Sequence, residues 1–223
     1  MWEDERIDGL IKAEDSETFA YLRQDFDDAP DYFVGPAALE DAKGITTTNA
    51  FENDYAWGHS ELVDFDNERG ERLQGALFYP ADYQPSESYP MIVYIYEKRS
   101  QLVHNYVVPT ERRPYNTAVF TQEGYFVLQP DIVYRDRDPG VSAVESVVPA
   151  VESVLARGIV DPNRVGLVGH SWGATRRATY RRGRLSSPRR VLQWFGHYLK
   201  GDDAPAWMTR GVTALEREEK MKR

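Results

Sequence analysis

The sequence predicts an α/β protein in which a mostly parallel sheet is flanked by helices. Three short apolar segments rich in β-branched residues, 91–96, 124–132 and 164–169, have the composition of buried strands. A helical segment lies between the second and the third, and the order strand, helix, strand is typical of a parallel crossover. Residues 1–57 have too few apolar side chains to form a core alone, so we expect them to pack against another surface.

Composition narrows the function classes. The chain has 223 residues, 41% of them hydrophobic, which is enough for one large domain with a packed core. Its net charge of −9 argues against nucleic acid or an anionic membrane as a partner. Cysteine is absent, which excludes disulfides, thiolate metal sites and a cysteine nucleophile. No apolar run approaches the ~20 residues of a membrane helix, and the acidic N-terminus lacks a signal-peptide pattern. These features do not determine the compartment, and a cytoplasmic location is only the default expectation.

The first part of the chain predicts two strands and a connector. TFAYLRQDF (18–26) and DYFVG (31–35) have strand composition, and the DDAP between them is typical of a turn. ITTTNAFENDYAW (45–57) predicts an extended connector. Residues 1–57 are thus interpreted as an accessory strand pair followed by a linker.

From residue 61 the sequence patterns that predict strands and helices are clearer. ELVDFD (61–66) and ERLQGALFYP (71–80) flank the turn sequence NERG and predict a β-hairpin. A helix follows the second apolar strand, because Ser142 and Glu145 have the spacing of a capping box. The valines after Ser142 recur at helical spacing and predict a buried face. Gly158 predicts the end of this helix, and Pro149 predicts a kink or a shorter helix.

The segment GHSWG (169–173) fits the pattern G-x-S-x-G of a nucleophile elbow. The apolar strand RVGLV runs directly into it, as the motif requires. Glycines are needed there because the turn from strand to helix is sharp. Such a turn exposes the hydroxyl of Ser171 at the carboxyl end of the sheet, and the backbone N–H of Trp172 would point to where an oxyanion forms.

Five segments together resemble the prolyl oligopeptidase family of serine peptidases, near its dipeptidyl-peptidase and acylaminoacyl-peptidase branches. They are ERLQGALFYP, PMIVYIYEKRSQ, FTQEGYFVLQPDIVYRD, GIVDPNRVGLVGHSWGA and a terminal FGHYLKG. The resemblance implies an α/β-hydrolase domain preceded by a β-propeller. Residues 1–57 then look like the last propeller strands and the linker. Residues 58–223 look like a partial, incomplete hydrolase domain, with an internal deletion or junction near 174–190.

The resemblance also implies roles for individual residues. Ser171 matches the nucleophile. Tyr96 matches the tyrosine whose hydroxyl joins the N–H of Trp172 in the family's oxyanion hole. The family's usual Tyr-Gly-Gly or Tyr-Ala-Gly reads Tyr96-Glu97-Lys98 in this chain.

The triad acid and histidine cannot be identified. In this fold both follow the serine, the acid first, and only fifty residues follow Gly173. The candidates that remain are His59, His104, His170, His197, Asp202 and Asp203. Each has the wrong place or the wrong order in the chain, and the histidines are therefore interpreted as surface or packing residues. A run of seven arginines over 176–190 stands where an apolar helix is expected. We interpret that run as the trace of a deletion with a foreign or out-of-frame join, the alternative being a basic patch for phosphates or nucleic acid.

The sequence therefore predicts a serine-type peptidase by family, catalytically impaired because only its nucleophile and oxyanion hole remain. Its partner would be a peptide substrate. Two alternatives stay open: a non-catalytic remnant or interaction protein, which could self-associate through exposed sheet edges, and an esterase-like hydrolase. No histidine pair at ligand spacing and no phosphate loop is present, so neither a metal nor an organic cofactor is expected.

Overall fold

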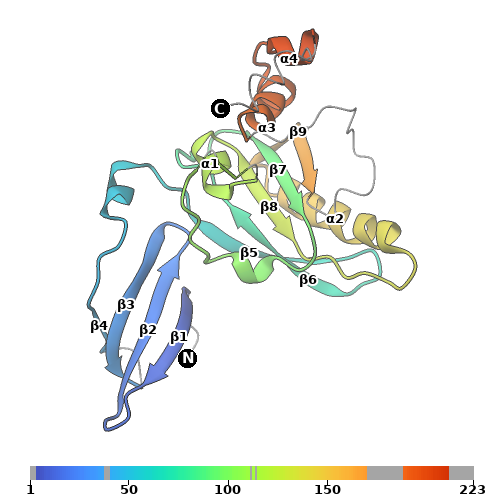
Figure 1. Cartoon of the computed structure of the whole chain (residues 1–223). Helices are drawn as coiled ribbons and strands as arrows, with labels where there is room; N and C mark the ends of the chain where they lie inside the picture. Colours follow the sequence, from blue (N-terminus) through green and yellow to red (C-terminus); the bar gives the residue numbers. More distant parts are fainter. Residues whose placement is uncertain (1–3, 38–40, 111, 114, 170–187, 211–223) are drawn as a thin grey trace, which may run out of the picture.

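The computed structural model describes residues 4–37, 41–110, 112, 113, 115–169 and 188–210, which form two β-sheets with helices around the second (Figure 1). The first sheet is an antiparallel meander in the order β1-β2-β3-β4. Its strands are β1 (Arg6–Lys12), β2 (Thr18–Asp25), β3 (Asp28–Pro36) and β4 (Lys43–Gly44).

The predicted pair of strands is present as β2 and β3, but the turn between them is tighter than DDAP suggested. Asp25 pairs with Asp28, so only Phe26 and Asp27 turn, and Pro30 already belongs to β3. The sequence did not predict β1. Its alternation is broken where Gly9 adopts φ +64° and the register shifts between Asp8 and Ile11.

The second sheet has the order β5-β6-β8-β7-β9. Its strands are β5 (Ser60–Asp66), β6 (Arg72–Phe78), β7 (Tyr89–Ile95), β8 (Phe126–Pro130) and β9 (Val160–Gly169). The expected hairpin is confirmed as β5 and β6. The expectation of a mostly parallel sheet is wrong. β7 pairs in parallel with β8 and β9, but β6 pairs antiparallel with both β5 and β8, so the sheet is mixed. The hairpin joins the same sheet and supplies these antiparallel pairings.

Alternate side chains of the sheet enter two apolar cores. Met91, Val93 and Ile95 of β7 face the helix α2 (Pro139–Leu155), which contributes Ala150 and Val154 to the same core. Ile92 points to the opposite face, where α1 (Thr117–Gln122) and α3 (Pro188–Phe195) pack. The sheet thus lies between helices on both faces, as an α/β protein requires.

The helix α2 starts earlier than its sequence suggested. Asp138 is the residue before the helix, and its side chain accepts a hydrogen bond from Val141 N. Pro139 fits the first turn, where no N–H partner is needed. Ser142, expected as the cap, is buried inside the helix and donates to Asp138 O at 2.7 Å. The helix also continues through Pro149 to Leu155.

The buried face of α2 consists mainly of small residues. Ser142, Ser146 and Ala150 are buried at intervals of four, together with Val154. Val144 and Val148, which were expected on this face, are 56% and 42% exposed. The buried stripe thus runs through the small residues, and Val144 and Val148 lie outside it. Gly158 has φ +73°, which confirms its predicted place after the helix.

The helix α3 covers the opposite face of β9. A Cβ on Gly166 would lie 2.6 Å from Phe195 Cε1, so the close packing of strand and helix depends on glycine. A π-helical turn, Gly196–Lys200, extends α3, and Gly201 ends it at φ +80°. A short helix, α4 (Ala206–Thr209), follows. The FGHYLKG segment thus belongs to a helix that packs on the sheet.

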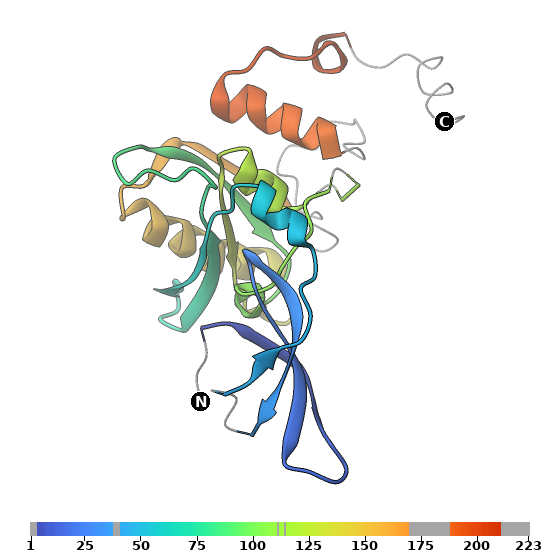
Figure 2. The same cartoon turned by 90° about the vertical axis from the view of Figure 1, so that its left-hand side faces the viewer.

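The first sheet packs against the second, as the poor apolar content of residues 1–57 predicted. Phe26 is fully buried, and its ring centroid lies 4.8 Å from that of Phe78 in β6. Figure 2 shows the first sheet reaching the second with the turn between β2 and β3, where Phe26 lies. In the described part of the chain, no helix combines the length and the apolar content needed to span a bilayer.

Candidate active site

The carboxyl ends of β8, β7 and β9 form the edge where ligands bind in sheets of this kind. β7 lies between β8 and β9, and its last residue, Ile95, is the partner of Gly169 at the end of β9. Tyr96 comes directly after Ile95. The predicted strand before the G-x-S-x-G motif is therefore confirmed up to its first glycine.

The rest of the motif lies outside the described residues. This applies to Ser171, Trp172 and Gly173, to His170, and to residues 174–187 of the expected junction. The arginine run ends inside the description, because Arg189 and Arg190 belong to the first turn of α3.

Tyr96 is partly buried, and its backbone is held in place from the neighbouring strand end. The hydroxyl of Tyr134 donates to Tyr96 O at 2.6 Å. Ile132 N donates to Glu97 O at 3.1 Å. Among the described residues, only Asn49 and Arg137 have positive φ without being glycine. Glu97 and Lys98 thus take an ordinary backbone conformation, which a glycine is not needed to reach.

Asp131 fixes the loop that follows Tyr96, a role that the sequence analysis missed. Its carboxylate accepts hydrogen bonds from Arg99 N at 2.6 Å, Ser100 N at 2.8 Å and Ser100 Oγ at 2.8 Å. Asp131 is only 8% exposed. The available signal was its place: an acidic residue directly after a buried strand. Through Asp131 the end of β8 determines the path of the chain beyond β7.

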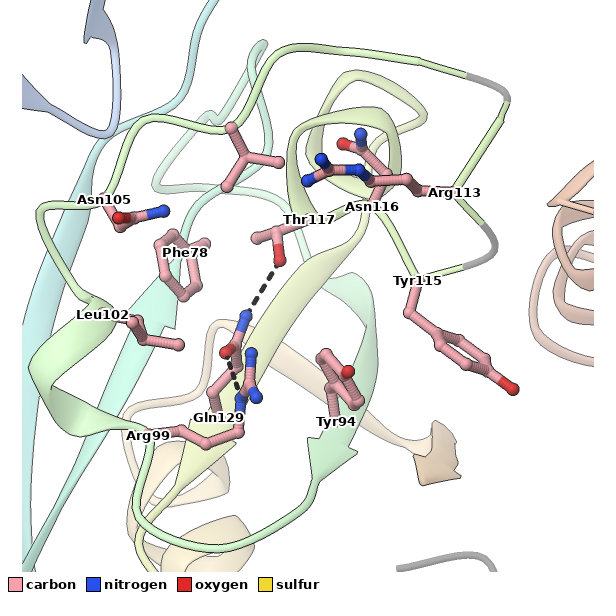
Figure 3. A pocket seen from close by; sticks show the side chains of 11 residues that line it. Phe78, Tyr94, Arg99, Leu102, Asn105, Arg113, Tyr115, Asn116, Thr117 and Gln129 are labelled. Atoms are coloured by element: carbon pink, nitrogen blue, oxygen red, sulfur yellow. Dashed lines mark hydrogen bonds between the residues drawn. The ribbon is translucent and has the colours of Figure 1, made fainter. Parts of the chain in front are cut away.

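Arg99 extends from this loop over the sheet. Its Nε donates to Gln129 Oε1 at 2.7 Å, and its guanidinium carbon lies 4.4 Å from the centre of the Tyr94 ring. Gln129 in turn donates from Nε2 to Thr117 Oγ1 at 2.8 Å. Burial lowers the pKa of Arg99, with the nearby Tyr94 and Tyr96 acting in the opposite direction. A pocket of about 380 Å³ opens beside these residues (Figure 3).

The described histidines have structural contacts. His59 stacks on Tyr79, with ring centroids 3.9 Å apart. His197 donates from Nδ1 to Asp202 O at 2.7 Å. His104 forms an imidazole–carboxylate pair, since its Nδ1 lies 3.0 Å from Asp25 Oδ1.

The pair of His104 and Asp25 connects the loop after β7 to the first sheet. Asp202 and Asp203 are exposed. In the part of the chain that the structure describes, no three histidine or carboxylate side chains are grouped so that they could hold a metal ion.

No family model matches this chain, and no curated protein matches it either. Solved structures do match. The isopeptidase AtxE2 aligns with a TM-score of 0.60 at 15% identity, over 77% of this chain and 28% of that one. A serine-to-alanine variant of AtxE2 with Astexin3-dC4 bound also aligns with a TM-score of 0.60, at 14% identity over 78% of this chain and 28% of that one.

An acylaminoacyl peptidase of Pyrococcus horikoshii matches with a TM-score of 0.56 at 14% identity, over 77% of this chain and 28% of that one. Dipeptidyl peptidase 4 of Porphyromonas gingivalis matches with a TM-score of 0.53 at 16% identity, over 74% of this chain and 25% of that one. These neighbours are peptidases of the prolyl oligopeptidase family. The likeness shows a shared fold. The chain spans little more than a quarter of their length.

Proposed function

We propose that this chain is part of a serine peptidase of the prolyl oligopeptidase type. Ser171 is the nucleophile that attacks the peptide carbonyl, and the oxyanion is held by Trp172 N–H and the hydroxyl of Tyr96. The observation that carries this proposal is the pairing of Ile95 with Gly169 in adjacent parallel strands. It supports a short distance between Tyr96 and the elbow, because the two segments leave neighbouring strands at the same level.

We also assign the two sheets to two parts of such a peptidase. The antiparallel four-stranded meander has the arrangement of one propeller blade, which supports residues 1–57 as the last propeller strands with the linker. The second sheet supports residues 58–223 as a partial hydrolase domain. The helix α3 packs on β9 only nineteen residues after that strand ends, which supports a junction near 174–190.

The proposed peptidase is catalytically weak by itself. A serine hydroxyl attacks slowly unless a histidine takes its proton and a third group orients that histidine. Among the described histidines, the side chain of His104 pairs with Asp25 of the first sheet and that of His197 with Asp202 O, so neither contact leads to the carboxyl ends of β7 and β9. With only the nucleophile and oxyanion donors, we expect a residual acceleration of about 10³–10⁴ over water.

The reaction of Ser171 with a fluorophosphonate tests this proposal. We expect slow labelling that maps to Ser171 by mass spectrometry and disappears in Ser171→Ala, together with very low cleavage of peptide anilides. Ser153→Ala is the matched control, because Ser153 lies on α2 and bonds only to its own helix. Labelling that persists in Ser171→Ala would refute the assignment of the nucleophile. Rapid peptide cleavage would refute the catalytic weakness.

A second candidate, an interaction protein that self-associates, is favoured by β9. It is the outermost strand of the second sheet, paired only with β7 among the described strands. Residues 165–169 of this edge carry neither charge nor proline, and Leu167 is 42% exposed. Such an edge readily pairs with another strand. Sedimentation velocity distinguishes the two: oligomers that dissociate in Leu167→Lys support association, and a monomer at every concentration contradicts it.

A further inference from the structure

The pocket beside Arg99 has two cationic residues and no acid among the described residues that line it. Arg99 and Arg113 both line it, and neither guanidinium has a carboxylate within ion-pair distance among the described residues. In Figure 3, Arg99 lies at one end of the pocket and Arg113 at the other. Two cations facing one cavity repel each other, and an anion between them removes that repulsion.

The bonds of Arg99 leave most of its donors available. A guanidinium has five N–H groups. The hydrogen bond to Gln129 occupies Nε, and Tyr94 covers one face of the group. The terminal nitrogens have no acceptor among the described residues. Gln129 and Tyr94 therefore hold the guanidinium in one orientation while its paired N–H groups face the cavity, an arrangement suited to a carboxylate.

The remaining lining indicates what the anion is attached to. The rings of Tyr94 and Tyr115 lie 5.6 Å apart at an angle of 34° and form an aromatic wall. Phe78 and Leu102 add apolar surface. The volume of about 380 Å³ is at the small end of ligand pockets. A small apolar or aromatic body with one carboxylate fits this combination of size and lining.

We propose that this pocket binds a carboxylate on a small apolar body, with Arg99 as the main contact and Arg113 as the second. Two sources share this chemistry: the carboxylate of a peptide, at its C-terminus or on an acidic side chain, and a free organic acid. The peptide source rests on the proposed peptidase function, since Tyr96 lies three residues before Arg99. The site itself does not depend on hydrolysis.

Calorimetric titration of the full chain carrying Ser171→Ala tests the proposal without turnover. The probes are Ala-Ala-Phe, its C-terminal amide, hippurate and inorganic phosphate. We expect the free acid to bind about tenfold or more tightly than the amide, because a charged bidentate contact is lost in the amide. Arg99→Gln should abolish that difference and Arg113→Gln should reduce it. Arg112→Gln, at an exposed neighbouring position, is the matched control.

The outcomes separate the sources. Binding of the tripeptide alone, or more tightly than hippurate, identifies a peptide carboxylate, and binding of hippurate alone, or more tightly than the tripeptide, identifies a free organic acid. Equal affinity for acid and amide, binding of phosphate alone, or no binding at all overturns the proposal. So does an Arg99→Gln variant that binds like the parent chain. Circular dichroism of each variant confirms that the fold is retained, and failure of Ser171 to react with fluorophosphonate would leave these titrations unaffected.

Discussion

Ile95 of β7 and Gly169 of β9 are partners in a parallel pairing, so the chain leaves both strands at the same level of the sheet. Tyr96 follows one of them and the G-x-S-x-G motif continues from the other. In the proposed peptidase, each strand end would thereby bring one part of the oxyanion hole to the same edge.

Replacing Tyr96 with phenylalanine removes the hydroxyl but keeps the ring. We expect the rate of fluorophosphonate labelling at Ser171 to fall on the order of 10²-fold, the usual effect of losing one oxyanion donor. Tyr32→Phe is the control, because Tyr32 is 49% exposed on the first sheet. An unchanged labelling rate in Tyr96→Phe would show that the ring only packs.

Asp131→Ala should destabilise the protein and disturb the site together. The substitution leaves Arg99 N, Ser100 N and the Ser100 hydroxyl without their acceptor. We expect the free energy of unfolding to fall by about 2–4 kcal/mol, measured by urea denaturation. Labelling of Ser171 should also slow, since Tyr96 belongs to the same loop. Asp66→Ala, at an exposed position on β5, should change neither quantity. A similar loss of stability in both variants would argue against the role of Asp131 in fixing the loop after Tyr96.

Gly166→Ala should weaken the contact between β9 and α3. The new methyl group would stand 2.6 Å from Phe195 Cε1, and such overpacking costs about 1–3 kcal/mol. Thermal unfolding measures the loss, and adding Phe195→Leu should recover part of it. Gly44→Ala is the control, because its Cβ would lie 3.5 Å from Phe33, an ordinary contact. Equal stability of Gly166→Ala and the parent chain would contradict this packing.

The pH dependence of stability should contain a contribution from Glu61. Burial by itself raises the pKa of Glu61, but hydrogen bonds from Tyr79 and Arg157 outweigh it, so the pKa of this carboxyl is lowered from its usual 4.5. A lowered pKa in the folded state stabilises the protein above the unfolded-state value, and the contribution disappears as the pH falls through the folded value. The side chains of Arg157 and Glu61 are both partly exposed, so the effect is modest.

Glu61→Gln tests this contribution through unfolding midpoints measured between pH 7 and pH 3. The variant should be less stable than the parent chain at pH 7. The two should converge as the pH falls through the lowered folded-state pKa of Glu61, because only the parent loses an ionised contact there. Glu68→Gln, at an exposed position, should follow the parent throughout. Parallel curves for Glu61→Gln and the parent would contradict the lowered pKa.

Local sequence patterns predicted most strands of the second sheet correctly. The hairpin and the three apolar strands appear because β-branched runs and turn residues act locally. The mixed direction of the sheet was missed, since nothing in ERLQGALFYP indicates that it lies beside β8 rather than apart from it. The start of α2 was missed because Ser142 has the spacing of a cap, while Asp138 and Pro139 compete for the same role and prevail.

The site was predicted only where one segment contains the signal. GHSWG and the strand before it are contiguous, so Gly169 could be placed at a strand end, and Tyr96 could be placed likewise because it ends the apolar run 91–96. The contacts of Asp131 with Ser100 and of Arg99 with Gln129 join residues about thirty positions apart. Such contacts depend on the pairing of β7 with β8, which no pattern in a single sequence specifies. The roles of Ser171, Trp172 and Tyr96 stay predictions.

The burial of Phe26 against Phe78 has a practical consequence for dividing this chain. The linker at 45–57 suggests a natural place to cut, but a shortened chain starting at Gly58 would expose the surface of β6 that Phe26 covers. Proteolysis within the linker should therefore yield two pieces that copurify. Anyone who isolates the second sheet for crystallisation or for screening needs a polar replacement at Phe78, or must keep the N-terminal hairpin attached.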